Sequence, residues 1–138
     1  MPEDDLLTAA RQARRKAYAP YSRFHVGAAV MAEDGRIFAG CNVENAAYPE
    51  GVCAEAGAIS AMALAGGRSI RFVAISAGPE DELRSCLPCG GCRQKILEFA
   101  APGAEVLIDT PEGMARHRFA DLMPHAFGPR DVTPLRPR

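Results

Sequence analysis

Hydrophobic and polar positions predict a helix and then a pair of strands in the first third of the chain. In the segment 4–17, leucine and alanine recur at helical spacing with arginines between them, and Pro20 follows. Residues 25–32 and 36–43 are mostly small or apolar, and an Asp-Gly pair between them favours a two-residue turn. We therefore expect an amphipathic helix that ends before Pro20, followed by an antiparallel hairpin.

The rest of the chain alternates helical and strand-like segments. Residues 53–65 are apolar on nearly every side, which is typical of a helix enclosed by other elements. Residues 72–75 and 106–108 have the pattern of short buried strands, and residues 92–100 that of a helix between them. Because strands that alternate with helices usually pair in parallel, the sheet is expected to be mixed, with helices on its faces. The pattern predicts an α/β fold.

Length and composition indicate one domain. A chain of 138 residues with 48% hydrophobic content can bury one core but is too short for two ordinary domains. We expect a single domain over residues 1–128 and an irregular, proline-rich tail over residues 129–138.

Net charge and hydropathy indicate which classes of molecule the protein can bind. The net charge of −1 provides no general basic field for a polynucleotide, although the C-terminal end is locally basic. No apolar run reaches the roughly 18 residues that cross a bilayer, and the acidic N-terminus is unlike a signal peptide. We therefore expect a soluble, cytoplasmic protein that acts on a free small molecule, with no nucleic acid or membrane as partner.

The spacing of the cysteines indicates a metal site. Five cysteines form an odd set, which favours a metal or reactive thiols over a disulfide framework. Cys89 and Cys92 can reach one ion from a single turn, and Cys53 would be a third ligand. Cys53 and Cys89 each precede a predicted helix, whose N-terminus lowers the pKa of a thiol and favours the thiolate that zinc requires.

Three protein ligands favour a catalytic zinc site. Tetrahedral zinc then keeps a fourth position for water, whereas a structural site is normally closed by four protein ligands. Zinc lowers the pKa of its bound water toward neutrality, so hydroxide is available. Glu55, two residues after Cys53, is placed to accept the water proton, pass it to a ring nitrogen and protonate a departing amine. The predicted reaction replaces an amine by oxygen.

Other interpretations of the cysteines stay open. A CxxC pair by itself also suits a structural zinc knuckle or a redox dithiol. Cys86 extends the pair to CxxCxxC, and as a fourth ligand it would turn the site into a closed, non-catalytic zinc module. Cys41 falls in a predicted strand and is more typical of a small buried hydrophobe.

The motifs C-A-E and P-C-x-x-C resemble those of the small, homotetrameric, zinc-dependent cytidine deaminases. The resemblance extends through the segments 18–28, 40–49, 92–94 and 127–129, so it covers most of the chain. It implies a three-layer α/β/α fold with a mixed, mostly five-stranded sheet, and one zinc ion per subunit. A cysteine as first ligand is unlike the histidine usual in tRNA and polynucleotide deaminases, which implies a free nucleoside substrate.

The resemblance also implies roles for substrate-binding residues. Asn42 and Glu44 would bind the ribose hydroxyls, because an amide and a carboxylate can together donate and accept hydrogen bonds there. Phe24 would stack near the pyrimidine, and the backbone of Ala54 would contact the edge of the base. The implied reaction converts cytidine and 2′-deoxycytidine to uridine and 2′-deoxyuridine with release of ammonia, in pyrimidine salvage. A modified cytosine nucleoside such as blasticidin S is the alternative substrate.

The same resemblance implies that several subunits assemble to form the active sites. Tyr48 and Phe127 look like pocket walls contributed by neighbouring subunits, so activity would depend on a homotetramer. Leu122 and Met123, close to Phe127, are further apolar residues that could lie at subunit contacts.

Two positions depart from the family pattern. Ala56 stands where the family often has an arginine that helps to offset the three thiolates. We expect Arg93 and the two helix N-termini to provide this compensation instead. His25 stands where proline is common, and we expect it to be a surface or interface residue rather than a ligand.

Overall fold

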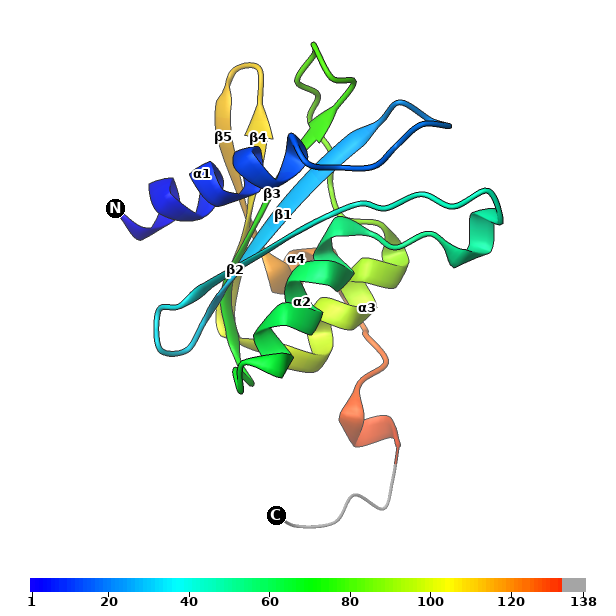
Figure 1. Cartoon of the computed structure of the whole chain (residues 1–138). Coiled ribbons are helices and arrows are strands. Elements are labelled where there is room, and N and C mark those ends of the chain that lie inside the picture. Colours follow the sequence, from blue (N-terminus) through cyan, green and yellow to red (C-terminus); the bar gives the residue numbers. More distant parts are fainter. Residues whose placement is uncertain (133–138) are drawn as a thin grey trace.

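The computed structural model describes residues 1–132, which form a five-stranded sheet with helices on both faces (Figure 1). The strand order is β2-β1-β3-β4-β5. Neighbouring strands are antiparallel except for β3 and β4, which are parallel as the alternation of helices and strands predicts. The strands are β1 (His25–Ala32), β2 (Ile37–Cys41), β3 (Ile70–Gly78), β4 (Ala100–Thr110) and β5 (Gly113–Arg118).

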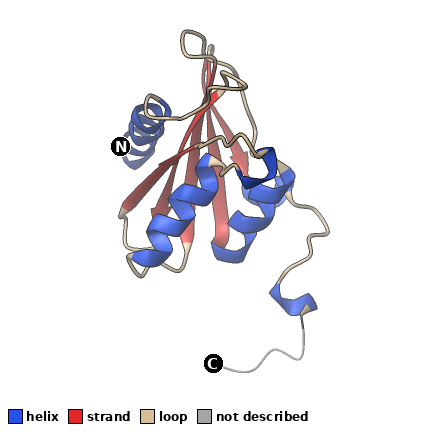
Figure 2. Cartoon of the chain, turned by 45° about the vertical axis from the view of Figure 1, so that its right-hand side comes forward, coloured by secondary structure: helices blue, strands red, loops and turns tan. Residues whose placement is uncertain are grey.

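The helices make the other two layers of an α/β/α arrangement, which confirms the expected fold class. Helix α1 covers one face of the sheet, whereas α2 and α3 lie side by side on the other (Figures 1 and 2). None of the helices within residues 1–132 has the length and apolar composition that crossing a bilayer requires. The helices are α1 (Pro2–Arg14), α2 (Ala54–Leu64), α3 (Gly90–Phe99) and α4 (Phe119–Leu122), with short 3-10 turns at Tyr48–Glu50 and Pro129–Asp131.

Successive side chains of a strand belong to two hydrophobic cores, one on each face of the sheet. On β1, Val30 points toward α2 and α3, while Met31 points toward α1, because successive side chains of a strand face opposite sides. Met62 of α2 and Ile96 of α3 are fully buried in the larger core. Burial of such a side chain stabilises the fold by roughly 1.5–3 kcal/mol, so this core fixes both helices on the sheet.

Close approaches at two glycines seat the helices on the sheet. A Cβ atom at Gly27 would lie 2.0 Å from the carbonyl oxygen of Ala10 in α1. A Cβ atom at Gly40 would lie 2.5 Å from the carbonyl oxygen of Ala54, the first residue of α2. Glycine is therefore required at Gly40 for the N-terminal turn of α2 to reach β2.

Several element boundaries differ from the prediction. Helix α1 ends at Arg14 rather than near Ala17, because the chain turns there and the N–H of Tyr18 donates to the carbonyl of Asn42 at 3.0 Å. Strand β4 is longer than the predicted 106–108, and none of the predicted segments corresponds to β5, although the resemblance implied a fifth strand. The first residues of the tail, Pro129–Asp131, form a short 3-10 turn. The rest of the tail, residues 133–138, lies outside the described residues.

Candidate active site

Two helix N-termini bring three thiols together. Cys53 is the residue directly before α2, and Cys89 is the residue directly before α3; both have extended backbone. Cys92 lies in the first turn of α3, where its side chain is buried. Because α2 and α3 pack side by side on the same face of the sheet, their N-termini present the three thiols to one point (Figure 2).

The sulfur geometry fits one zinc ion. The Sγ atoms of Cys53, Cys89 and Cys92 all lie within 4.8 Å of one another. Thiolates on tetrahedral zinc, with bonds of about 2.3 Å, lie roughly 3.8 Å apart, so small side-chain adjustments close the three sulfurs on one ion. Cys86 lies outside this cluster, and its thiol donates to the carbonyl of Leu87 at 3.5 Å. The set therefore leaves one tetrahedral position without a cysteine.

The electrostatics of the cluster also favour a bound cation. Burial raises the pKa of Cys53 and of Cys92, whereas a hydrogen bond with the backbone of Cys92 lowers the pKa of Cys89. Three thiolates so close together repel one another, so a divalent cation is what allows all three to ionise.

Glu55 is a buried carboxyl beside this cluster. It lies in the first turn of α2, and only 5% of its surface is exposed. Burial raises its pKa, and the opposing effects of its own backbone N–H, of Cys92 and of the positive charge of Lys95 do not cancel this rise. A raised pKa brings a carboxyl closer to the range in which it can both accept and donate a proton at neutral pH.

A cavity of about 350 Å³ opens in front of the thiols and Glu55. This size is within the usual range of about 300–1,000 Å³ for small-molecule sites. Its walls come from residues 42–44, 51–55, 86–87 and 89, together with Val26 and Tyr48. Valine and leucine side chains supply much of the wall, namely Val26, Val43, Val52 and Leu87. These residues were missed in the sequence, since isolated valines and leucines form no motif.

Comparison with known proteins agrees with this geometry. Residues 2–107 match the family described as the cytidine and deoxycytidylate deaminase zinc-binding region. The chain belongs to this family. It is 44% identical to a cytidine deaminase of Mycobacterium tuberculosis (strain ATCC 25618 / H37Rv) over 135 residues, which cover 96% of each chain. A cytidine deaminase of Sporosarcina psychrophila is 40% identical over 134 residues, again with 96% of each chain covered.

Solved structures give the same assignment for the fold. The crystal structure of cytidine deaminase from Burkholderia pseudomallei matches with a TM-score of 0.82 at 40% identity, over 92% of this chain and all of the other. The crystal structure of cytidine deaminase from Mycobacterium tuberculosis matches with a TM-score of 0.78 at 41% identity, over 93% of this chain and 98% of the other. The protein is thus a zinc-dependent hydrolytic deaminase, and its three-cysteine cluster fits one zinc ion per chain.

Two polar residues of the deaminase cavity are held by the chain around them. Asn42 accepts a hydrogen bond from the N–H of Val26 at 2.8 Å and donates to the carbonyl of Phe24 at 2.9 Å. Glu44 accepts hydrogen bonds from the backbone of Tyr21 at 2.9 Å and from the backbone and hydroxyl of Ser22. These bonds lower the pKa of Glu44, despite a smaller opposing effect of burial. Ser22 was not recognised in the sequence, because its partner is distant along the chain.

The predicted aromatic residues are placed unequally. Tyr48 lines the cavity of its own chain, although 76% of its surface is exposed, and its ring meets that of Tyr21 edge to face at 6.0 Å. Phe24 is half-buried and packs against the larger core rather than lining the cavity. Phe127 is 60% exposed and lies outside the cavity, with its carbonyl accepting a hydrogen bond from Gln94 at 2.9 Å.

Arg93 holds the turn that precedes Cys89 and Cys92. Its guanidinium donates to the carbonyl of Pro88 at 2.8 Å and to the carbonyl of Leu122 at 3.2 Å. It therefore ties the residue before Cys89 to the end of α4. Leu122 and Met123 are themselves partly buried against the core of their own chain.

Proposed function

We propose that the deaminase hydrolyses the C4 amino group of cytidine and 2′-deoxycytidine, forming uridine or 2′-deoxyuridine and ammonia. The observation that carries this proposal is one cavity of about 350 Å³ lined by Glu55, Cys53 and Cys89. Its size suits a nucleoside rather than a polymer, and relatives that align over 96% of this chain are named cytidine deaminases.

In this proposal Cys53, Cys89 and Cys92 hold zinc, which supplies a Lewis acid that activates water for attack on C4. Glu55 accepts a proton from the attacking water and donates it to the ring nitrogen N3. Glu55 then carries the proton of the new C4 hydroxyl to the amino group, which leaves as ammonia while the C4 carbonyl forms. One buried carboxyl thus moves both protons, and its raised pKa makes it suitable as donor as well as acceptor.

Asn42 and Glu44 are proposed to hold the sugar. The Asn42 amide uses one donor and one acceptor on neighbouring backbone, so one of each is left for a ribose hydroxyl. The Glu44 carboxylate accepts from Tyr21 and Ser22 and keeps acceptor capacity for a second hydroxyl. Because both side chains are already fixed by backbone hydrogen bonds, they bind the sugar with little further loss of side-chain entropy. Phe24, whose carbonyl accepts a hydrogen bond from Asn42, is proposed to stack near the pyrimidine base.

We infer that the active enzyme is a homotetramer whose sites are shared between subunits. Leu64 on α2 is 91% exposed, although the helix is apolar on nearly every side. Tyr48 and Phe127 are also largely exposed. Exposed large apolar residues on several elements support burial against other subunits.

A substrate screen with a matched pair of variants tests the reaction. Zinc-loaded protein is assayed on cytidine, 2′-deoxycytidine, adenosine and blasticidin S, with and without Glu55→Gln. We expect turnover of the first two, and a loss of about 10²–10⁴-fold in Glu55→Gln with zinc content unchanged. Glu98→Gln, an exposed carboxyl on α3, is the control and keeps full activity.

Two outcomes would overturn the proposal. Turnover of blasticidin S without turnover of cytidine would move the substrate to a modified nucleoside. Retained activity in Glu55→Gln would remove Glu55 from the proton transfers.

A further inference from the structure

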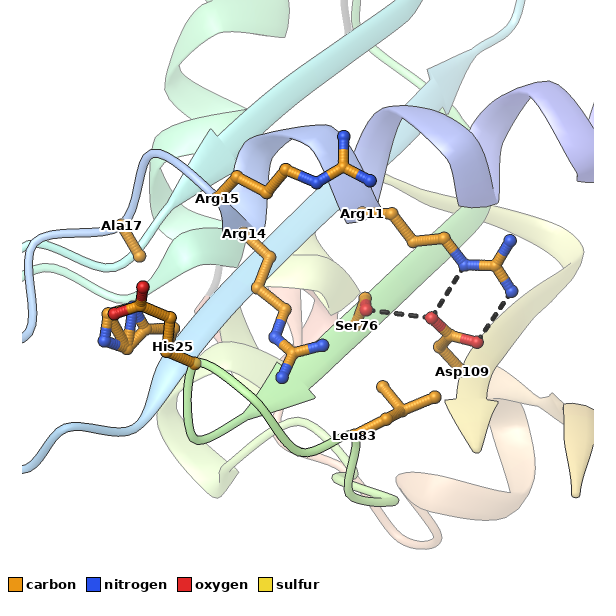
Figure 3. A pocket seen from close by; sticks show the side chains of 9 residues that line it. Arg11, Arg14, Arg15, Ala17, His25, Ser76, Leu83 and Asp109 are labelled. Atoms are coloured by element: carbon orange, nitrogen blue, oxygen red, sulfur yellow. Dashed lines mark hydrogen bonds and ion pairs between the residues drawn. The ribbon is translucent and has the colours of Figure 1, made fainter. Parts of the chain in front are cut away.

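A second cavity, of about 560 Å³, lies on the α1 side of the sheet (Figure 3), and none of its lining residues belongs to the zinc cluster. Its walls carry Arg11 and Arg14 of α1 and Arg15 directly after the helix. The ends of β3 and β4 supply Ser76 and Asp109, and the loop that follows β3 supplies Glu80. The cavity thus combines three arginines and the imidazole of His25 with two carboxylates.

Arg11 and Asp109 form an ion pair within this cavity. Both oxygens of Asp109 accept hydrogen bonds from Arg11, at 2.9 Å each, and Oδ2 also accepts from the buried hydroxyl of Ser76 at 2.9 Å (Figure 3). Such a two-point contact between guanidinium and carboxylate is strong and fixed in orientation. Asp109 therefore neutralises Arg11 and has little capacity left for the other arginines.

The positively charged side chain of Arg14 is held only by neutral groups, which are two backbone carbonyls. One nitrogen of its guanidinium donates to the carbonyls of Pro79 and Glu82, at 2.6 Å each. Within residues 1–132 no carboxylate pairs with Arg14, and its other nitrogens form no hydrogen bond. The two carbonyls fix the side chain in the cavity while its charge stays available.

Arg15 adds a second positive charge to the lining of this cavity, with its guanidinium extending away from that of Arg14 (Figure 3). No hydrogen bond or ion pair holds its side chain within the described part of the chain. The C-terminal end of α1 offsets about half a unit of positive charge, and Glu80 offsets one more. The pair of arginines still leaves the cavity with an excess of positive charge.

We propose that this cavity binds the phosphate group of a small phosphorylated metabolite on Arg14, and that the exposed side chain of Arg15 turns toward the bound phosphate. Guanidinium groups match the oxygens of a phosphate in both charge and geometry. The cavity is larger than a bare phosphate ion needs and falls in the size range of small-molecule sites. The rest of the metabolite lies along the wall between Ala17 and Leu83.

Calorimetric titration of the zinc-loaded protein at low ionic strength tests this site. The probes are ribose 5-phosphate, ribose and inorganic phosphate, so that the phosphate and the attached group are measured separately. We expect ribose 5-phosphate to bind, inorganic phosphate to bind more weakly and ribose not to bind. Added salt weakens binding, because the contacts are charged and partly exposed.

Three variants separate the cavity from a general effect of charge. Arg15→Gln removes a side chain that holds nothing else in place, and it weakens ribose 5-phosphate at least about tenfold. Glu80→Gln removes the remaining negative charge and tightens binding severalfold. Arg71→Gln changes an exposed arginine on β3 outside the cavity and leaves binding unchanged. Deamination and zinc content stay as in the unaltered protein in all three.

The proposal fails on any of three results. The first is absence of binding by ribose 5-phosphate. The second is binding that Arg15→Gln and Glu80→Gln leave unchanged. The third is equal affinity for ribose 5-phosphate and inorganic phosphate, which would reduce the site to a contact with a bare ion.

Discussion

Single residues around the thiols show what local spacing can and cannot predict. The ligand set of Cys53, Cys89 and Cys92 follows from sequence, because each thiol lies at or just inside the start of a helix and helix starts are readable. The partners of Arg93 were not predictable, since Leu122, at the end of α4, lies 29 residues away along the chain. A motif thus predicts the reacting groups better than the groups that position them.

Arg93 is expected to strengthen zinc binding from outside the ligand set. Arg93→Ala removes the hydrogen bond that holds the carbonyl of Pro88, next to Cys89, and takes away a positive charge near three thiolates. Loss of such an outer contact typically weakens a metal by about 10–100-fold. Competition with a chelator measures the zinc dissociation constant, with Arg71→Ala as control. Equal zinc affinity in Arg93→Ala and the unaltered protein would show that the helix ends are sufficient.

Asp109 is expected to make stability depend on acidity. Burial tends to raise its pKa, but hydrogen bonds from Arg11 and Ser76 and the nearby arginine charges outweigh burial and hold the pKa below its usual value. A carboxyl whose pKa is lowered on folding stabilises the fold fully above its unfolded pKa of about 3.9. This contribution is lost as the pH falls through the lower pKa of the folded state.

Asp109→Asn checks this expectation by urea denaturation across pH. At neutral pH the variant is expected to lose about 1–3 kcal/mol of unfolding free energy, because Arg11 keeps only a weaker neutral partner. The difference from the unaltered protein then shrinks below about pH 4. A difference that stays constant down to acid pH would mean that the ionised form contributes nothing.

At the scale of elements, the predicted helices and strands are confirmed where buried apolar residues recur at the spacing of a helix or a strand. The hairpin β1–β2, helix α2, helix α3 and the parallel pair β3–β4 were all expected, since each packs large or small apolar side chains on a core. Strand β5 was missed because only alanine and histidine lie on its half-buried face. It pairs with β4 across a tight turn at Thr110 and Gly113, and the two residues between them, Pro111 and Glu112, lack the Asn-Gly or Asp-Gly signal of a hairpin.

The close contact between Gly40 of β2 and the first turn of α2 positions the helix start that carries the active-site residues. In Gly40→Ala the new Cβ would lie 2.5 Å from the Ala54 carbonyl and from the Ala58 nitrogen, so α2 must shift off the sheet. Overpacking of this kind costs about 1–3 kcal/mol, and it moves the helix start that carries Cys53 and Glu55. We expect lower unfolding free energy and weaker zinc binding together.

Gly57→Ala is the matched control for that change. Gly57 lies inside α2, where an added Cβ meets its nearest atom at an ordinary 3.6 Å. Alanine favours a helix over glycine by up to about 1 kcal/mol, so the control should be neutral or stabilising. If Gly40→Ala and Gly57→Ala bind zinc equally tightly, the close packing of α2 against Gly40 does not affect zinc affinity.

At the scale of the whole molecule, one chain leaves part of the proposed machinery outside its own cavity. Cys53, Glu55, Asn42 and Glu44 line the cavity of one chain, whereas Phe127 lies elsewhere on its surface. Sequence resemblance implied that Phe127 serves a neighbouring subunit, and its 60% exposure in a single chain agrees with that role without testing it. A shared site has a consequence that no single-chain site has, namely complementation between inactive variants.

Mixed assemblies of Phe127→Ala and Glu55→Gln provide this test. Each variant alone is expected to lose activity, by at least about tenfold for the missing wall and by more for the missing base. In a mixed tetramer, a subunit with intact Glu55 can receive Phe127 from its Glu55→Gln neighbour, so activity returns in some sites. Mixing Glu55→Gln with Cys53→Ala gives no recovery, because both side chains line the cavity of the same chain. Co-expression, with sedimentation to verify the tetramer, measures the outcome; an active monomer, or absence of recovery in the first mixture, would place the whole site within one subunit.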